Sequence, residues 1–260
     1  MLPPAFASAE ANLWLMLVAA IRPGAAFFAA PLFGQTSVPV QVRFVIAVAI
    51  GMAGYAAVPF RLPPDGIASF AGIGLVFGEV MAGLALGFAV QIGFSAALLA
   101  GETIGNAMGL GFSALMDPAT GAPTQALATF LSMLGSFMFL SIGGHLTLAT
   151  IIVDSYRSLP VGGPMLSNDS IHGLVLFGGD MIAAGFAIAL PVGFALVLVQ
   201  IVMGMLARSA PAMNLFAVGL PATLLAGLVL LAISAPSIGE GITNAIQRGL
   251  DEAHAIARGH

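Results

Sequence analysis

The sequence predicts an all-α, polytopic integral membrane protein, and three observations lead to that fold class. Of the 260 residues, 59% are hydrophobic and only 7% are charged, whereas a soluble domain carries about 25% charged residues. The mean hydropathy is +1.06. The uncharged runs 181–207 and 209–239 each exceed the ~20 residues that a membrane-spanning helix needs. Because the apolar runs are continuous rather than alternating, a transmembrane β-barrel is not expected.

About six hydrophobic helical segments are expected, separated by prolines, glycines and charged residues. They cover roughly residues 11–30, 42–58, 66–100, 124–153, 174–206 and 212–235. A proline inside a helix removes a backbone hydrogen bond, so Pro23 in the first segment and Pro191 in the fifth predict kinks. The apolar side chains in residues 238–260 recur at helical spacing, which predicts an amphipathic C-terminal tail. We expect the whole chain, 1–260, to form a single membrane domain.

The third segment is too long for one ordinary span. Residues 66–100 would make a helix of roughly 52 Å, against a hydrocarbon core of ~30 Å. It is either a hairpin broken near Gly78-Glu79 or one long helix. A ladder of small residues at every fourth position favours one helix, because small side chains let helix backbones approach closely in lipid. The candidate packing and assembly positions on this ladder are Ala85, Ala89, Gly93, Ala97 and Gly101.

An irregular apolar segment follows this ladder. Glycines and prolines recur through 109–123 and exclude a regular helix, yet the residues between them are apolar. Irregular backbone with apolar side chains is typical of a re-entrant or pore-lining loop. The flexible thioethers of Met108 and Met116 would suit a deformable seal.

Four charged residues in or beside the apolar segments are functional candidates: Arg22, Glu79, Glu102 and Asp180. Charges at membrane depth are costly and by default functional. For Arg22 the alternative is a short or tilted helix from which the guanidinium snorkels to the headgroups. No arginine occurs between Arg61 and Arg157, so neither glutamate has a basic partner nearby in sequence. An unpaired carboxylate at depth would be protonated, hydrogen-bonded or in a watery cavity, and Glu102 has the further alternative of a helix end among the headgroups.

The motifs of several function classes are missing. The chain has no G-x-x-x-x-G-K-[ST] loop, no H-E-x-x-H and no G-x-S-x-G, and it has no cysteine, so ATPase, zinc protease, esterase and thiol chemistry lack their residues. A net charge of −4 without a basic patch argues against nucleic acid. We expect no enzymatic activity, no cofactor and no metal site.

Short motifs spread along the chain resemble one family in their order and spacing. They are Arg22-Pro23, Pro31-Leu-Phe-Gly34, Val38-Pro39 with Arg43, Gly101-Glu102-x-x-Gly105-x-x-x-Gly109-x-Gly111 ending in Asp117-Pro118, Gly143-Gly144-His145, Ser155, Pro160, and Arg208-x-x-Pro211-x-x-Asn214-x-Phe216-x-Val218-Gly219-x-Pro221. Together they are similar to the FliR/SctT family of type III secretion export-gate proteins, and the flagellar FliR branch resembles the chain more than the virulence branch does.

The resemblance implies a subunit of the flagellar export gate, in the bacterial inner membrane at the flagellar basal body. Its implied partners are FliP- and FliQ-like subunits and an FlhB-like subunit, and the pore they form passes unfolded flagellar proteins. It further implies that assembled helices bend and lie largely above the bilayer plane. The residues that would plug the pore are Gly105, Met108, Gly109, Leu110, Gly111, Phe112, Leu115, Met116, Asp117 and Pro118.

Two alternatives stay open at the level of sequence. One is the virulence-type (injectisome) homologue of the same gate. The other is a stand-alone proton-coupled secondary transporter that uses Glu79, Glu102 or Asp180 as its carboxylate.

Overall fold

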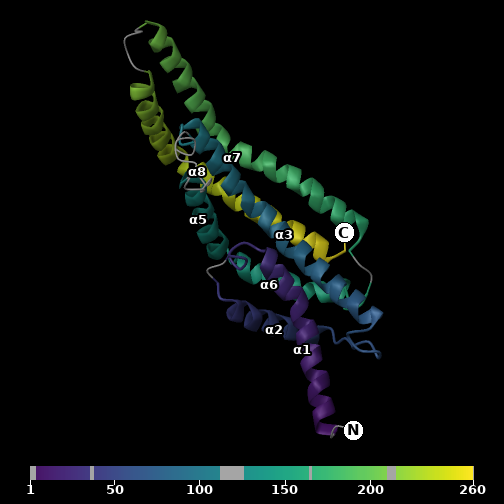
Figure 1. The fold of residues 1–260 in the computed structure, drawn as a ribbon. Coiled ribbons are helices and arrows are strands. Elements are labelled where there is room, and N and C mark those ends of the chain that lie inside the picture. Colours follow the sequence, from purple (N-terminus) through teal and green to yellow (C-terminus); the bar gives the residue numbers. More distant parts are fainter. Residues whose placement is uncertain (1–3, 36–37, 112–125, 164–165, 210–214, 260) are drawn as a thin grey trace. The chain divides into compact units, whose positions relative to one another are not determined.

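All regular structure in the described part of the chain is helical. The computed structural model describes residues 4–35, 38–111, 126–163, 166–209 and 215–259. The helices, labelled in Figure 1, are α1 (Pro4–Ala29), α2 (Val40–Ala57), α3 (Phe70–Ala107), α5 (Ala126–Ser141), α6 (Gly144–Ser158), α7 (Asn168–Ser209) and α8 (Leu215–Ala257). The expected all-α fold class is confirmed.

Five of these helices are long and apolar enough to cross a membrane: α1, α2, α3, α7 and α8. A sixth span is possible if α5 and α6, which meet at a bend of 64°, count as one broken span. The fourth hydrophobic segment is therefore two helices rather than one. The break lies at Gly143, whose φ of +70° is the left-handed conformation that ends helices.

The third hydrophobic segment is one long helix and not a hairpin. α3 has 38 residues, and Gly78 and Glu79 lie inside it. Figure 1 draws α3 as one uninterrupted helix. At 1.5 Å per residue it is roughly 57 Å long, about twice the hydrocarbon thickness.

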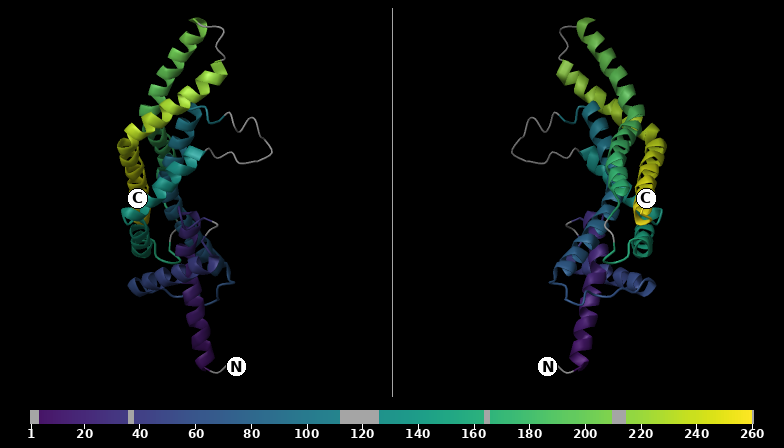
Figure 2. Two further views of the ribbon diagram at one scale, coloured as in Figure 1. Left: turned by 90° about the vertical axis from the view of Figure 1, so that its left-hand side faces the viewer. Right: turned by 90° about the vertical axis from the view of Figure 1, so that its right-hand side faces the viewer.

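Interior prolines do not end the last two helices. α7 contains Pro191, and α8 contains Pro221 and Pro236; Figure 2 draws both as continuous helical ribbons. Membrane helices tolerate proline where neighbouring groups satisfy the carbonyls that it frees. Residues 238–257 consequently form the C-terminal part of α8, where the sequence had indicated a tail distinct from the last span.

The chain forms two compact units. Unit 1 comprises Met1–Gly93, Phe139–Gly178 and Gln247–His260, and unit 2 comprises Phe94–Met138 and Gly179–Ile246. Unit 1 thus holds α1, α2, α6, the first part of α3, the start of α7 and the end of α8. Unit 2 holds the end of α3, α5 and most of α7 and α8.

Glycines allow very close helix contacts within unit 1. A Cβ at Gly51 of α2 would lie 2.1 Å from the carbonyl oxygen of Ala19 in α1. On α3, a Cβ at Gly83 or Gly87 would lie 2.2 Å or 2.1 Å from a carbonyl oxygen of α1. Real Cβ atoms do not come this close, so α2 and α3 can pack directly on the backbone of α1 only because these positions have no side chain.

Candidate functional site

A buried ion pair joins α1 to α3 inside unit 1. Arg22 Nε donates to Glu79 Oε2 at 2.9 Å, and Arg22 Nη2 donates to Glu79 Oε1 at 2.8 Å, the two-pronged geometry that makes arginine–carboxylate pairs strong. Arg22 is 1% exposed and Glu79 is 2% exposed. Arg22 is therefore fully buried, so the snorkelling alternative for its guanidinium does not hold.

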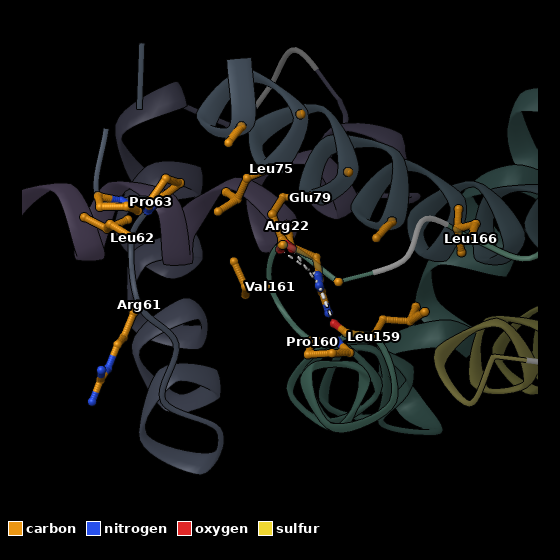
Figure 3. A pocket seen from close by; sticks show the side chains of 17 residues that line it. Arg22, Arg61, Leu62, Pro63, Leu75, Glu79, Leu159, Pro160, Val161 and Leu166 are labelled. Carbon is orange, nitrogen blue, oxygen red and sulfur yellow. Dashed lines mark hydrogen bonds and ion pairs between the residues drawn. The ribbon is translucent and has the colours of Figure 1, made fainter. Parts of the chain in front are cut away.

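Helix α6 completes the set of partners of the guanidinium. Arg22 Nη1 donates to Ser155 Oγ at 2.9 Å, and Nη2 donates to the Leu159 carbonyl at 2.7 Å. Four of the five N–H donors of Arg22 thus have acceptors. Its Cζ also lies 4.2 Å from the centre of the Tyr156 ring, within the ~6 Å range of a cation–π interaction. Figure 3 shows Arg22 between Glu79 and Leu159.

Tyr156 has a second role, at a backbone position that a proline has left unpaired. In a helix the carbonyl of Ala19 would accept from the N–H of residue 23, but Pro23 has none. The Tyr156 hydroxyl donates to that carbonyl at 3.0 Å. The ring has room because Gly54 faces it: a Cβ there would lie 2.4 Å from a ring carbon. The three helices therefore meet in one close contact, to which α1 contributes Pro23, α2 Gly54 and α6 Tyr156.

A cleft of about 560 Å³ opens beside the ion pair. Arg22 and Glu79 form part of its wall, and Leu75, Pro160 and Arg61 line it further out. In Figure 3, Arg61 points away from the ion pair. Because Arg22 is paired with Glu79 and four of its five N–H donors have acceptors, this ion pair presents no net charge to the cleft.

The four charged residues that the sequence predicts as functional lie in different surroundings in the structure. It brings Arg22 and Glu79 together, although 57 positions separate them. Glu102 on α3 is partly exposed and Asp180 on α7 is exposed, and neither forms an ion pair with a described residue. Ser155 is one of the residues that carry the family resemblance, but the sequence does not predict it as a partner of Arg22. It predicts neither Tyr156 nor Leu159 as a partner.

One sequence signal could have found Tyr156. Pro23 inside an apolar helix implies a freed carbonyl, and a buried tyrosine hydroxyl needs a partner. Nothing in the sequence, however, indicates that the Tyr156 hydroxyl and the carbonyl freed by Pro23 are partners of each other.

In unit 2, the base of the candidate plug segment is a well-defined helix end. Gly109 has φ +83°. Leu110 N–H donates to the Gly105 carbonyl and Gly109 N–H to the Asn106 carbonyl, both at 3.0 Å. These two bonds with a left-handed glycine constitute a Schellman motif, so α3 ends at this point, as the glycine pattern predicts.

Two other helices of unit 2 hold this helix end. Gln200 of α7 donates from Nε2 to the Ala107 carbonyl at 2.9 Å. The Thr223 hydroxyl of α8 lies 3.4 Å from the Met108 carbonyl, but its one hydrogen has closer acceptors in its own helix, the carbonyls of Leu220 at 3.0 Å and Gly219 at 3.1 Å. Met108 is buried, and its side chain occupies the space where a Cβ of Gly227 would lie. The side chain of Met108 therefore packs on α8.

Half of the proposed plug residues belong to this base. Gly105, Met108, Gly109, Leu110 and Gly111 are described, and Gly105 and Met108 are buried. The other proposed plug residues lie outside the described residues: Phe112, Leu115, Met116, Asp117 and Pro118.

The small-residue ladder of α3 is buried over its length, at Ala85, Ala89, Gly93, Ala97 and Gly101. In unit 2 a Cβ at Gly101 would lie 2.5 Å from the Cα of Ala128 in α5, so α3 and α5 touch backbone to backbone. α5 is the first described helix after the plug segment. This close contact thus holds together the two helices that flank it. Among the described residues no group of three or more His, Asp or Glu side chains is placed to hold a metal ion.

Over residues 13–249 the sequence matches the family described as bacterial export proteins, family 1. The chain belongs to this family. It is 34% identical to the flagellar biosynthetic protein FliR of Escherichia coli K12 over 209 residues, covering 80% of this chain and 79% of that protein. It is 33% identical to FliR of Pectobacterium carotovorum over the same shares. With FliR of Caulobacter vibrioides it shares 27% identity over 248 residues, 94% of this chain and 98% of that protein.

The resemblance to FliR seen in the short motifs is thereby confirmed. As a member of the bacterial export family with several membrane-spanning helices, the chain is an integral membrane component of the flagellar export apparatus. The family is one of export proteins and not a known enzyme family.

Proposed function

We propose that this chain is a subunit of the flagellar type III export gate in the bacterial inner membrane, at the flagellar basal body. With FliP- and FliQ-like subunits it forms the pore that passes unfolded flagellar proteins, and an FlhB-like subunit associates with the gate. The observation that carries the proposal is the family match over residues 13–249. The flagellar names of the relatives favour the flagellar gate over the virulence-type one.

The length of the helices supports a multisubunit assembly. The apolar stretch Asn168–Leu206 of α7 has 39 residues, roughly 58 Å at 1.5 Å per residue, and no ordinary tilt fits it into a ~30 Å hydrocarbon core. Yet large apolar side chains stay exposed along it, including Ile182, Leu190, Phe194, Val202 and Met205. Apolar surface beyond the lipid needs protein to cover it, which is what neighbouring subunits supply.

The base of the plug segment supports a gating role for residues 105–118. α3 ends at a glycine whose backbone conformation is specific, Gln200 of α7 donates to the Ala107 carbonyl of that end, and the Met108 side chain packs on α8. A segment that closes a pore must leave from a fixed position, because a plug on a loose base would not close reproducibly. The irregular apolar segment therefore departs from an anchored helix end, as a pore plug requires.

The ion pair disfavours Glu79 as the proton-carrying residue of the transporter alternative. A proton-coupled carboxylate has to take up and release a proton in each cycle. Glu79 accepts two N–H bonds from a guanidinium that is itself fully buried. Breaking such a pair costs ~3–5 kcal/mol, so Glu79 fits a structural pair rather than a proton carrier.

The assembly is tested by co-expression. We expect an affinity-tagged chain to co-purify with FliP- and FliQ-like proteins from detergent-solubilised membranes, and cells without the chain to lose motility. A tagged chain that purifies alone as a stable monomer and transports a solute in liposomes would contradict the proposal.

The plug is tested by removing residues 109–117 from the assembled gate. A second variant replaces the same nine residues with a glycine–serine segment of equal length, so that the chain length is kept and only the apolar side chains are lost. If the apolar segment closes the pore, both variants assemble and both admit ions or small dyes. Unchanged permeability in an assembled deletion variant would contradict the plug role and leave the subunit role untouched.

A further inference from the structure

An open apolar groove of about 750 Å³ lies between α1, α2 and the first part of α3, wholly within unit 1. Along α1 it extends from Trp14 to Phe28, and Phe44 and Ala47 of α2 form the facing wall. Arg43 is the one charged residue of its lining. The volume falls in the range of small-molecule sites, ~300–1,000 Å³.

Arg43 has no counter-ion among the described residues. Its Nη2 donates to the carbonyls of Gln35 and of Val38, the latter at 2.9 Å, and its Nε is buried without any hydrogen-bond partner. A buried guanidinium N–H without an acceptor is unfavourable. An anion at this end of the groove would supply the missing negative charge.

The start of α2 adds to the attraction for an anion. Arg43 lies in the first turn of α2, and Pro39, the residue before the helix, provides no side-chain cap. The N–H groups of a first helical turn and the positive end of the helix dipole favour negative charge. An arginine at a helix end also suits the headgroup level of a bilayer.

We infer that this groove binds an anionic phospholipid, with its phosphate at Arg43 and one acyl chain along α1 towards Trp14. From Trp14 to Phe28 the helix rises roughly 21 Å, enough for a chain that spans one leaflet of ~15 Å. Basic pockets between membrane helices are known to take anionic headgroups. The lining is apolar except for Arg43, so it matches the chemistry of an acyl chain that carries an anionic headgroup.

The single tryptophan of the chain makes the site directly observable. Trp14 is the only tryptophan in the sequence, it lines the groove and it is 44% exposed. Acyl chains with bromine atoms quench tryptophan fluorescence on contact. The full-length chain is reconstituted in phosphatidylcholine vesicles that contain a low, matched fraction of brominated phosphatidylglycerol or brominated phosphatidylcholine.

We expect the phosphatidylglycerol to occupy the site about fivefold more readily than the phosphatidylcholine, the factor that one basic residue contributes at an anionic membrane surface. Arg43→Gln should abolish this preference, and Arg43→Lys should keep most of it. Arg61→Gln, which removes an arginine outside the groove, should leave it unchanged. Raising the salt from ~0.1 M to ~1 M, which shortens the Debye length from ~10 Å to ~3 Å, should weaken the preference in the unmodified chain.

Three results would overturn the inference. The first is equal quenching by the two lipids in the unmodified chain. The second is a preference that survives Arg43→Gln. The third is a Trp14 that neither lipid quenches, which would mean that protein covers the groove. The salt dependence in the unmodified chain decides the matter even if Arg43→Gln fails to fold.

Discussion

The hydroxyl of Tyr156 donates a hydrogen bond to the backbone carbonyl of Ala19, 137 positions earlier in the chain, at 3.0 Å. Pro23 has no N–H with which to satisfy this carbonyl inside α1, and Tyr156 of α6 replaces it. The same ring lies under the guanidinium of Arg22. The proline inside α1 is thus coupled to the buried ion pair through one side chain.

Tyr156→Phe should destabilise the protein by ~1–3 kcal/mol, because it leaves the buried Ala19 carbonyl without a donor. Pro23→Ala restores an N–H at residue 23, so in that background Tyr156→Phe should cost less than half as much. The measurement is a double-mutant cycle on the free energy of unfolding in mixed detergent micelles. Strictly additive effects would show that the hydroxyl does not substitute for the missing N–H.

Arg22→Gln or Glu79→Gln should each destabilise unit 1 by ~3–5 kcal/mol, since each leaves an uncompensated buried partner. Arg22→Lys should also be costly, because an ammonium cannot reproduce the two-pronged contact with Glu79. The measurement is the amount of folded protein in the membrane, followed by unfolding in detergent. The control is Arg61→Gln, which should stay within ~0.5 kcal/mol of the unmodified chain; a loss as large as that of Arg22→Gln would contradict the assignment.

Gly101→Ala should destabilise unit 2 by ~1–3 kcal/mol through overpacking, because its new Cβ would meet the backbone of Ala128 in α5. Gly74→Ala on the same helix is the matched control, since nothing lies within 4 Å of its position. Alanine there should be neutral, or stabilising by up to ~1 kcal/mol from helix propensity. Thermal unfolding of the two variants compares them, and equal melting temperatures would contradict the close contact of α3 with α5.

Gly109→Ala should make the assembled gate permeable to ions, because alanine disfavours the left-handed conformation by ~1–2 kcal/mol and its Cβ would lie 2.9 Å from the Leu220 side chain. Gly109→Asn tolerates the conformation better and should leak less. Gly66→Ala imposes the same backbone strain, at φ +81° with open space around it, but outside the plug segment. Ion leakage in cells that carry each variant is the measurement, and a leak from Gly66→Ala as large as from Gly109→Ala would mean that strain alone is responsible.

Local sequence by itself determined the membrane class, the helical content and the end of α3. An uncharged run longer than ~20 residues has no stable alternative to a helix in lipid, and Gly109 followed by glycines and prolines ends a helix through local backbone energetics. These properties depend on neighbouring residues only, which is why they could be predicted. The similarity to FliR likewise depends on the order and spacing of motifs.

Only the tertiary structure decided which groups pair. Arg22 meets Glu79, Ser155 and Leu159 across 57, 133 and 137 positions, and composition contains no information on which helices lie against one another. The same holds for the break at Gly143 and for the continuity of α3 through Glu79: a glycine or a charge permits either outcome. Packing selects between them, because a buried guanidinium is stable only where several helices bring it acceptors at once.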